Sequence, residues 1–268
     1  MNVNSLHIDV TNLNVLLTGG SNGIGLQISK AFLLKGASVV NWDLKETEQV
    51  KKLKEEFGNR YQYEYVDISN ETSIQQSHKR LPEQVNVLIN NAGLILKSPL
   101  TDIETSDWDK IYDVNVKGTM LVTKYVIPKI KGTSRGRIIN LSSMTAKIGL
   151  ETYSLYSSTK AAVSNLTKVW SLELSKYEIT VNAICPGWVD TQMKGKLIEA
   201  ISNLHDLNEE DALSAILSFV PQHRYIQTEE IAFACLFLSS GLSQGISGQE
   251  LFIDNGLTNT FKPGFHMK

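Results

Sequence analysis

The sequence predicts an α/β fold with a doubly wound, seven-stranded parallel sheet and helices on both of its faces. Short apolar runs alternate with longer helical patterns, which is the order that strands and crossover helices follow in a parallel sheet. Runs such as NVLIN and RIINL are almost continuously apolar, as strands buried on both faces are. With 268 residues and no repeat, low-complexity tract or linker, the chain is expected to form a single domain over 1–268.

The seven expected strands are spaced so that crossover helices fit between most of them. In chain order they are LNVLL (13–17), ASVVNW (37–42), YQYEYV (61–66), VNVLIN (85–90), GRIINLS (136–142), ITVNAIC (179–185) and ELFID (250–254). The expected helices span about 23–35, 45–57, the segment that carries Tyr156, and about 229–238. The helix over 45–57 is rich in charge, as expected of a helix with one solvated face.

About forty residues separate the strand that ends near Cys185 from the helix that begins near Thr228. Within them apolar residues recur at helical spacing in two stretches, Leu197, Ile198, Ile201 and Leu204, then Leu213, Ile216, Leu217 and Val220. The pattern predicts a helical hairpin over about 190–222, after the carboxyl end of a strand, where open α/β sheets bind ligands. Two interpretations stay open: the hairpin is a lid over a substrate, or it packs on the rest of the fold without a function of its own.

Composition and charge exclude several classes of function. The formal net charge of −2 gives no general attraction to nucleic acid or to anionic membranes, which favours a small-molecule partner. Cys185 and Cys235 lie in apolar runs, so buried thiols are expected rather than a disulfide, and the five histidines lack the spacing of a metal site. Without a leader or a run of about 18 to 20 apolar residues, the expected location is the cytoplasm, with no membrane contact.

A glycine-rich turn predicts dinucleotide binding. The stretch TGGSNGIG places Gly19, Gly20, Gly23 and Gly25 between the first expected strand and an amphipathic helix. Glycines there permit a tight turn, let backbone amides approach an anionic group, and point the amino terminus of the helix at a pyrophosphate. Asp43 ends the second expected strand, where an acidic side chain accepts hydrogen bonds from a ribose diol.

The stretch LYSSTKAA contains a second candidate. Tyr156 and Lys160 stand four residues apart, so on a helix their side chains are neighbours. By itself this pair is a weak signal, because an aromatic residue beside a solvated lysine is common on helices.

The spacing Thr18-Gly19-x-x-x-Gly23-x-Gly25 resembles that of the short-chain dehydrogenase/reductase family, and the resemblance extends over nearly the whole chain. The matching segments follow in the family's order: NNAG (90–93), Asn115 in DVNVKG, Ser143 thirteen residues before Tyr156, PGWVDT (186–191) and GISGQELFIDNG (245–256). One departure is DNG at 254–256, where many relatives have a double glycine. The resemblance implies a Rossmann-type fold and hydride transfer between a small molecule and a nicotinamide cofactor.

Four residues carry the catalytic roles that the resemblance implies. Tyr156 exchanges a proton with the substrate oxygen, Ser143 holds that oxygen, and Asn115 holds a water that links Lys160 to solvent. A free phenol has a pKa of about 10, and a nearby ammonium together with an oxidised nicotinamide favours the phenolate. Lys160 is therefore expected to lower the pKa of Tyr156 and, by resemblance, to bind the nicotinamide ribose.

NAD is expected as the cofactor in preference to NADP. Asp43 would repel a ribose 2′-phosphate, and Asn22 stands where phosphate-preferring relatives often carry Arg or Lys, although Lys45 is near enough in sequence to meet a phosphate. The residues that the resemblance assigns to the cofactor are Gly19, Ser21, Asn22, Gly23, Ile24, Asp43, Asp67, Ile68, Asn91, Ala92, Gly93, Tyr156, Lys160, Pro186, Gly187, Val189 and Thr191.

The expected substrate is a neutral secondary alcohol or ketone. At the family's pocket positions stand Ile95, Met144, Tyr153 and Trp188, with Ala146 and Leu150, and no Arg or His is placed to pair with a carboxylate. The segment CPGW also resembles hydroxybutyrate dehydrogenases. Thr145 and Tyr153 replace the carboxylate-binding His and Lys of those enzymes, which disfavours that substrate.

Alternatives remain open. One is a catalytically silent NAD-binding regulatory protein, since a nucleotide-binding fold does not oblige chemistry. Another is an NADP-dependent carbonyl reductase, and a third is a methyltransferase with an adenosyl cofactor, which would not need the Tyr156 and Lys160 pair. Family members are commonly tetramers, so the resemblance implies a homotetramer or homodimer.

Overall fold

The computed structural model describes residues 7–133 and 136–259, and these form one seven-stranded sheet in the order β3-β2-β1-β4-β5-β6-β7. All neighbouring strands are parallel. The strands are β1 (Asn14–Thr18), β2 (Ser38–Asp43), β3 (Tyr61–Tyr65), β4 (Val87–Asn90), β5 (Arg137–Leu141), β6 (Thr180–Pro186) and β7 (Glu250–Ile253). The predicted doubly wound α/β fold is confirmed, and its direction of winding reverses between β1 and β4.

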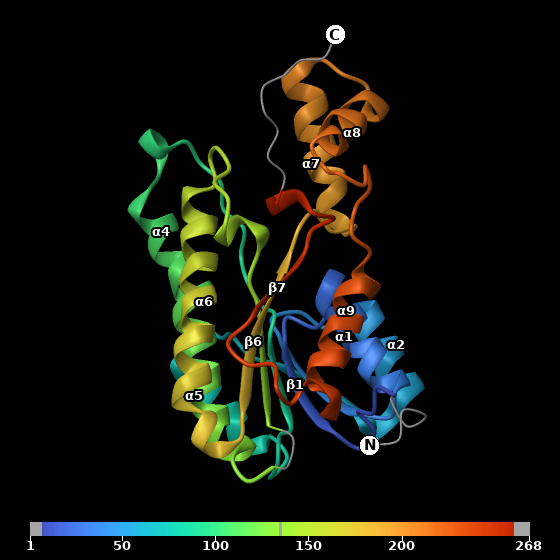
Figure 1. Cartoon of the computed structure of the whole chain (residues 1–268), viewed down its shortest axis with the longest axis vertical. Coiled ribbons are helices and arrows are strands. Elements are labelled where there is room, and N and C mark those ends of the chain that lie inside the picture. The colour runs from blue at the N-terminus through green and yellow to red at the C-terminus, as the bar shows by residue number, and fades with distance from the viewer. Residues whose placement is uncertain (1–6, 134–135, 260–268) are drawn as a thin grey trace.

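Helices cover both faces of the sheet, as Figure 1 shows. On one face lie α1 (Gly23–Leu34), α2 (Glu48–Phe57) and α9 (Thr228–Ser239), and on the other α3 (Glu71–Ser77), α5 (Thr119–Ile130) and α6 (Ser154–Glu173), with α4 (Thr105–Tyr112) beside α6. A hydrophobic core lies on each face of the sheet, and successive side chains of β1 point into opposite cores. Leu17 packs with Phe32 of α1, whereas Leu16 packs with Val126 of α5. The helices predicted from sequence are confirmed.

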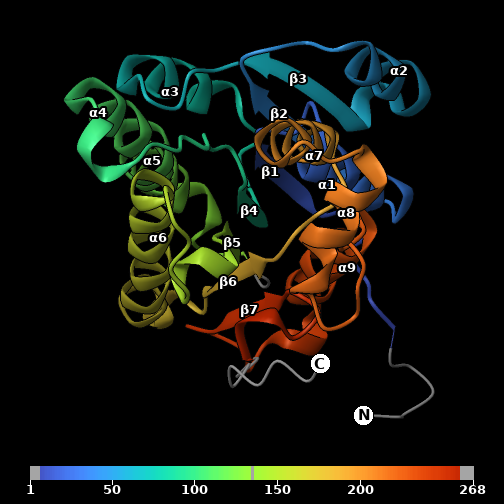
Figure 2. The same ribbon diagram turned by 90° about the horizontal axis from the view of Figure 1, so that it is seen from above.

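The predicted helical hairpin is present as α7 (Gln192–His205) and α8 (Glu209–Ser218), which contact each other above the carboxyl ends of the strands (Figures 1 and 2). Asn208 caps α8 by accepting a hydrogen bond from the Asp211 amide. Ile216 and Val220 of its predicted apolar face are buried. The side chains of Leu197, Ile201 and Leu204 lie outside the described residues.

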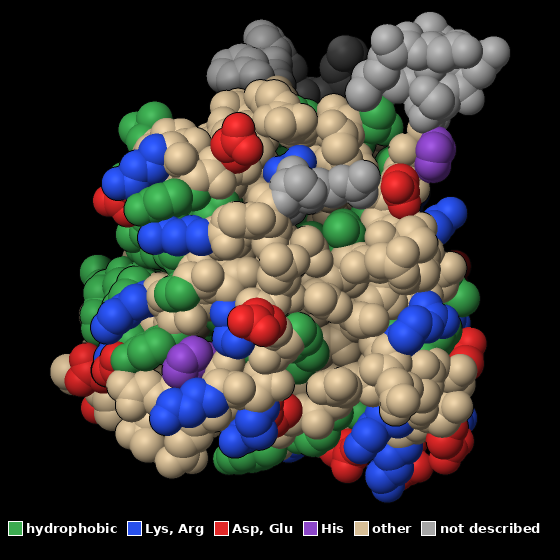
Figure 3. All heavy atoms as spheres, turned by 90° about the horizontal axis from the view of Figure 1, so that it is seen from below, with side chains coloured by type: hydrophobic (Ala, Val, Ile, Leu, Met, Phe, Trp, Pro, Cys, Tyr) green, Lys and Arg blue, Asp and Glu red, His purple; other side chains and the backbone are tan. Residues whose placement is uncertain are grey.

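The opposite edge of the sheet, at the amino ends of the strands, faces the viewer in Figure 3, where basic and acidic side chains are interspersed. Within residues 7–133 and 136–259, no helix is both long and apolar enough to cross a bilayer. Over the same residues, no group of three or more His, Cys, Asp and Glu side chains is arranged to hold a metal ion.

The close packing of the glycine turn on α1 predicts a large cost for one methyl group. In Gly25→Ala the added Cβ would overlap the Gly19 carbonyl oxygen, which is backbone and cannot rotate away. We expect a loss of about 2–4 kcal/mol in the free energy of unfolding, measured by urea denaturation.

A matched control is Gly195→Ala in α7, where an added Cβ meets no described atom within 4 Å. It should stabilise the chain slightly, by about 0.5–1 kcal/mol, because alanine favours the helix. Equal effects of the two substitutions would contradict the packing argument.

Candidate active site

The predicted site residues gather at the carboxyl ends of the strands, around the reversal between β1 and β4. Gly19 has a φ of +70°, and a Cβ there would lie 2.8 Å from the Cα of Ala92, so the glycine turn and the segment after β4 are in backbone contact. Figure 2 views the molecule from this edge, with α7 and α8 nearest the reader. A doubly wound sheet binds ligands in the crevice that forms at such a reversal.

Thr18 and Asn91 hold these two segments together. The Thr18 hydroxyl oxygen accepts hydrogen bonds from the backbone amides of Asn91 and Ala92, each at 3.1 Å. In return the Asn91 side-chain amide donates to the carbonyls of Thr18 (3.1 Å) and Gly19 (2.8 Å). Asn91, which the sequence assigns to the cofactor path, therefore also fixes the shape of the glycine turn.

A fully buried asparagine supports the glycine turn from below. Asn41 of β2 accepts a hydrogen bond from the Gly20 amide at 2.8 Å and donates to the hydroxyls of Ser21 and Tyr61, both at 3.1 Å. A Cβ at Gly20 would lie 2.5 Å from the Asn41 side-chain oxygen, so this position requires glycine. Asn41 is not among the site residues predicted from the sequence, although a polar residue inside the apolar run VVNW is the signal that marks it.

The amino terminus of α1 is open toward the crevice. Asn22, at the N-cap position, makes no side-chain capping hydrogen bond, and the first turn of α1 carries no acidic residue. Across from it, Thr191 approaches to 3.4 Å from where a Cβ of Gly23 would stand. Free amides at a helix start attract anions, so this cradle fits the pyrophosphate of a dinucleotide.

The Asp43 carboxylate is held by three backbone amides. One of its oxygens accepts from Ser21 (2.9 Å), and the other from Leu44 (2.7 Å) and Lys45 (3.3 Å). Thr47 adds a hydrogen bond from its hydroxyl to the Ser21 carbonyl. Asp43 thus ties the glycine turn to the loop after β2, in a fixed orientation at the end of that strand.

Ser143, Tyr156 and Lys160 form a compact, largely buried cluster between β5 and α6. Ser143 follows β5 and accepts hydrogen bonds from the amide and hydroxyl of Thr145, at 3.2 and 3.1 Å. The Lys160 ammonium donates to the Leu141 carbonyl at 2.7 Å and lies 5.6 Å from the centroid of the Tyr156 ring. The spacing in sequence therefore does bring Tyr156 and Lys160 side by side on one helix face.

Burial dominates the protonation of this cluster. It raises the pKa of the Tyr156 phenol to about 12, although a hydrogen bond with Ser143 opposes the change. Burial also lowers the pKa of the Lys160 ammonium to about 8. In the chain alone the phenol is consequently a proton donor, and the lowered phenol pKa expected from the sequence requires further positive charge.

Asn115 lies in a π-helical turn, Asp113–Gly118, between α4 and α5. Its side chain is buried and clamps the backbone of Leu94, accepting from the amide at 2.7 Å and donating to the carbonyl at 2.9 Å; it also donates to the Thr159 hydroxyl at 3.0 Å. Both amide hydrogens are used, so Asn115 fixes the segment after NNAG and the turn of α6 that precedes Lys160.

The remaining predicted cofactor residues surround the same crevice from two sides. Gly187 packs against β7, its amide donating to the Ile253 carbonyl at 2.8 Å, and Val189 pairs in parallel with Ile226. Asp67 turns its carboxylate to the amide and hydroxyl of Ser69, so it caps its own loop after β3. Ile68 is buried, with its carbonyl oxygen 2.9 Å from where a Cβ of Gly118 would stand.

The predicted substrate residues differ in exposure. Ile95 is 38% exposed, and Tyr153 and Trp188 are half-buried, so all three keep solvent-accessible surface. Met144 is 2% exposed and lies behind the surface in this structure. The rings of Tyr153 and Tyr156 meet edge to face, with centroids 6.3 Å apart.

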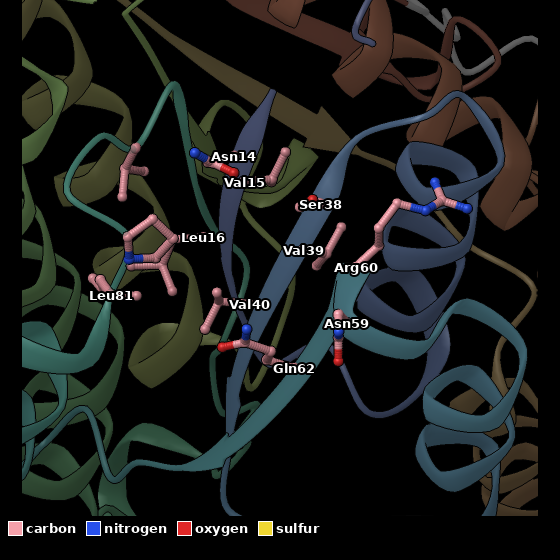
Figure 4. Close-up of a pocket in the computed structure, with 12 residues that line it drawn as sticks. Asn14, Val15, Leu16, Ser38, Val39, Val40, Asn59, Arg60, Gln62 and Leu81 are labelled. Atoms are coloured by element: carbon pink, nitrogen blue, oxygen red, sulfur yellow. The ribbon is translucent and has the colours of Figure 1, made fainter. Parts of the chain in front are cut away.

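Two cavities lie apart from this cluster. One, of about 150 Å³, is lined by residues at the amino ends of β1 and β2 and the start of β3, including Asn14, Ser38 and Arg60 (Figure 4). The other, of about 480 Å³, lies between α6 and β7 and includes Lys168 and Glu250. Neither is lined by Ser143, Tyr156 or Lys160.

Comparison with known proteins agrees with the geometry. A family model described as Enoyl-(Acyl carrier protein) reductase matches residues 19–258. The uncharacterized oxidoreductase YxjF of Bacillus subtilis is 33% identical over 91% of this chain and 97% of that protein. The 3-oxoacyl-(acyl-carrier-protein) reductase FabG of Thermotoga maritima is 32% identical over 90% of this chain and 96% of that protein.

Solved structures show the same fold over the same length. The Cj0485 dehydrogenase superposes with a TM-score of 0.88 at 28% identity, covering 95% of this chain and 97% of that one. A variant of actinorhodin polyketide ketoreductase, solved with NADPH, gives 0.86 at 32% identity, covering 93% and 98%. With its glycine turn, its Ser143, Tyr156 and Lys160 cluster and these relatives, the chain belongs to the short-chain dehydrogenase/reductase family of NAD(P)-binding oxidoreductases.

Proposed function

We propose that this protein is an NAD-dependent oxidoreductase that interconverts a secondary alcohol and a ketone, with Tyr156 as the general acid and base. The observation that carries the proposal is the cluster of Ser143, Tyr156 and Lys160, which lies at the same edge of the sheet as the glycine turn. An oxidoreductase of this family needs a proton donor and acceptor beside the reacting oxygen, and the Tyr156 phenol supplies it.

Ser143, Tyr156 and Lys160 have different roles in the transfer of one proton. A bound nicotinamide cofactor would accept a hydride in its oxidised form and supply one in its reduced form, and the oxidised form would add a positive charge to the site. Ser143 would donate its hydroxyl hydrogen to the substrate oxygen and stabilise the negative charge that develops there. Tyr156 gives its proton to that oxygen in ketone reduction and takes it back in alcohol oxidation. Lys160 orients the cofactor ribose and keeps a positive charge behind the phenol.

The Asp43 site supports NAD over NADP. The Ser21, Leu44 and Lys45 amides form the kind of backbone nest that binds anions, and the Asp43 carboxylate fills it. A 2′-phosphate would meet a like charge and find these donors occupied, whereas a ribose diol can donate to the remaining lone pairs of the carboxylate. The ketoreductase relative was solved with NADPH, so an NADP-dependent carbonyl reductase is the second candidate.

We further propose that residues 1–268 form a single domain, in which α7 and α8 act as a lid over the substrate. We also propose that the chain self-associates as a homodimer or homotetramer. Apolar side chains on two helices support this: Val169 (42% exposed) and Leu172 (77%) on α6, and Met120 (36%) on α5.

Removing the Tyr156 hydroxyl separates an enzyme from a silent cofactor-binding protein. In Tyr156→Phe the proton donor is lost while the ring stays, so turnover of neutral secondary alcohols with NAD should fall about 10²–10⁴-fold. NAD binding, measured by isothermal titration calorimetry, should change little. Tyr153→Phe is the matched control, because its hydroxyl has no assigned role in proton transfer. Wild-type activity in Tyr156→Phe would refute the mechanism.

Emptying the Asp43 nest should change cofactor preference. In Asp43→Ala three amides become available to a 2′-phosphate and a repelling charge is removed, so the ratio of dissociation constants for NADP and NAD should fall about 10–100-fold, measured by calorimetry. Glu46→Gln removes a charge close in sequence that contacts Lys54 rather than the nest, and should leave the ratio nearly unchanged. Equal shifts in the two variants would indicate a general charge effect.

The lowered pKa of Lys160 predicts a pH dependence of stability. Between about pH 8 and pH 10.5 the unfolded chain binds more protons at this lysine than the folded chain does, so the folded state gains stability as pH rises through that window. Across this pH window the free energy of unfolding of the wild type should rise by up to about 3 kcal/mol relative to that of Lys160→Met, measured by urea unfolding. Lys30→Met, at an exposed lysine of α1, is the matched control.

A further inference from the structure

We propose that Lys97 binds an anionic group of the substrate, and that this substrate is a hydroxy or oxo acid whose carboxylate is separated by a chain from the carbon that reacts. The proposal rests on the alcohol and ketone chemistry proposed above and adds a second recognition point to the same site. It differs from the neutral substrate that the sequence predicts.

The segment that carries Lys97 is fixed at one end to Asn115 and at the other end to the loop before α6. At one end Asn115 clamps Leu94 with two hydrogen bonds, of 2.7 and 2.9 Å. At the other end the Ser98 amide donates to the Thr152 carbonyl at 3.0 Å. Lys97 and Tyr153 each stand one residue from that last hydrogen bond, which explains why two residues so distant in sequence are held together.

Lys97 lies on the aromatic wall of the site. Its ammonium is 5.2 Å from the centroid of the Tyr153 ring, a cation–π contact, and the Tyr153 ring in turn meets the Tyr156 ring at 6.3 Å between centroids. The Tyr153 ring therefore contacts both the Lys97 ammonium and the Tyr156 ring. A ligand that reaches the Tyr156 hydroxyl can extend along the Tyr153 ring toward the ammonium.

The Lys97 charge has no carboxylate partner within residues 7–133 and 136–259. Lys117 and Lys194, by contrast, pair with acids one helical turn away, at 3.1 and 3.0 Å. Contact with the Tyr153 ring leaves the ammonium hydrogens available, because a π face attracts the charge without accepting a full hydrogen bond from each N–H. An anionic ligand group would supply the missing counter-charge.

The position of the charge selects the class of acid. Among the described residues the cation over the Tyr156 ring is Lys160, whereas Lys97 contacts the neighbouring Tyr153 ring. A carboxylate at the Lys97 ammonium therefore fits best when a chain separates it from the carbonyl that meets the phenol. An acid with a longer apolar chain would span the distance and cover the Tyr153 ring. Short hydroxy acids are therefore disfavoured.

The test uses straight-chain methyl-ketone acids of increasing length, each beside its methyl ester. Binding to the NADH-saturated protein is measured by calorimetry, and KM and kcat are measured where turnover occurs. For wild type we expect the best acid to bind about 5- to 10-fold more tightly than its ester, the range of a partly exposed ion pair. The difference should shrink at high salt, because ions screen an exposed charge.

Lys97→Met keeps the apolar stem on the Tyr153 ring and removes the charge, so the acid should lose its advantage through KM, with kcat and ester binding unchanged. Lys97→Arg should restore the advantage. The matched control is Lys147→Met, since Lys147 also lies over an aromatic ring, Phe252 at 5.0 Å, but donates to Asn259. That variant should keep the wild-type preference for the acid.

An unchanged acid-to-ester ratio in Lys97→Met, or equal binding of acid and ester to wild type at every length, would overturn the proposal. Calorimetry decides this point even without turnover. If the wild type turns over none of these compounds and no neutral alcohol or ketone, the proposed function fails. If it turns over the esters but Lys97→Met does not change the preference for the acid, only the anion-binding role of Lys97 fails.

Discussion

The backbone contact between the glycine turn after β1 and the segment after β4 is the constraint on which the rest of the site depends. Gly19 and Ala92 approach so closely that no side chain fits at residue 19, and the Thr18 hydroxyl satisfies two amides that this approach would otherwise leave unpaired. The same contact sets where Gly93 and Leu94 run, and through Asn115 it fixes the wall of the proposed substrate site.

Several buried polar side chains hydrogen-bond to one another near this contact and join the sheet to two helices. Asn90 and Asn140 are register partners on β4 and β5, joined at 2.8 Å, and they extend to Thr123 of α5 and Thr167 of α6. These bonds tie α6 to the sheet, so Lys160 is held against the Leu141 carbonyl despite the cost of burying its charge.

Much of the fold and the cluster of Ser143, Tyr156 and Lys160 was predictable because the signals are local. Strands buried on both faces read as apolar runs, and the spacing of Tyr156 and Lys160 needs only the geometry of one helix. Asn41 was missed because its role depends on a neighbouring strand and a turn twenty residues away. Met144 stands at a pocket position in the sequence pattern but is buried, since which way a side chain faces depends on its neighbours.

Hydrophobic periodicity and short spacings in the chain are enough to predict the succession of strands and helices, the glycine turn and the family motifs. Three properties depend on the tertiary structure: the Asp43 carboxylate fills a nest of three amides, burial raises the pKa of Tyr156, and Lys97 lies over Tyr153. These properties depend on distances between segments far apart in the chain and on the exclusion of water, neither of which a linear pattern encodes.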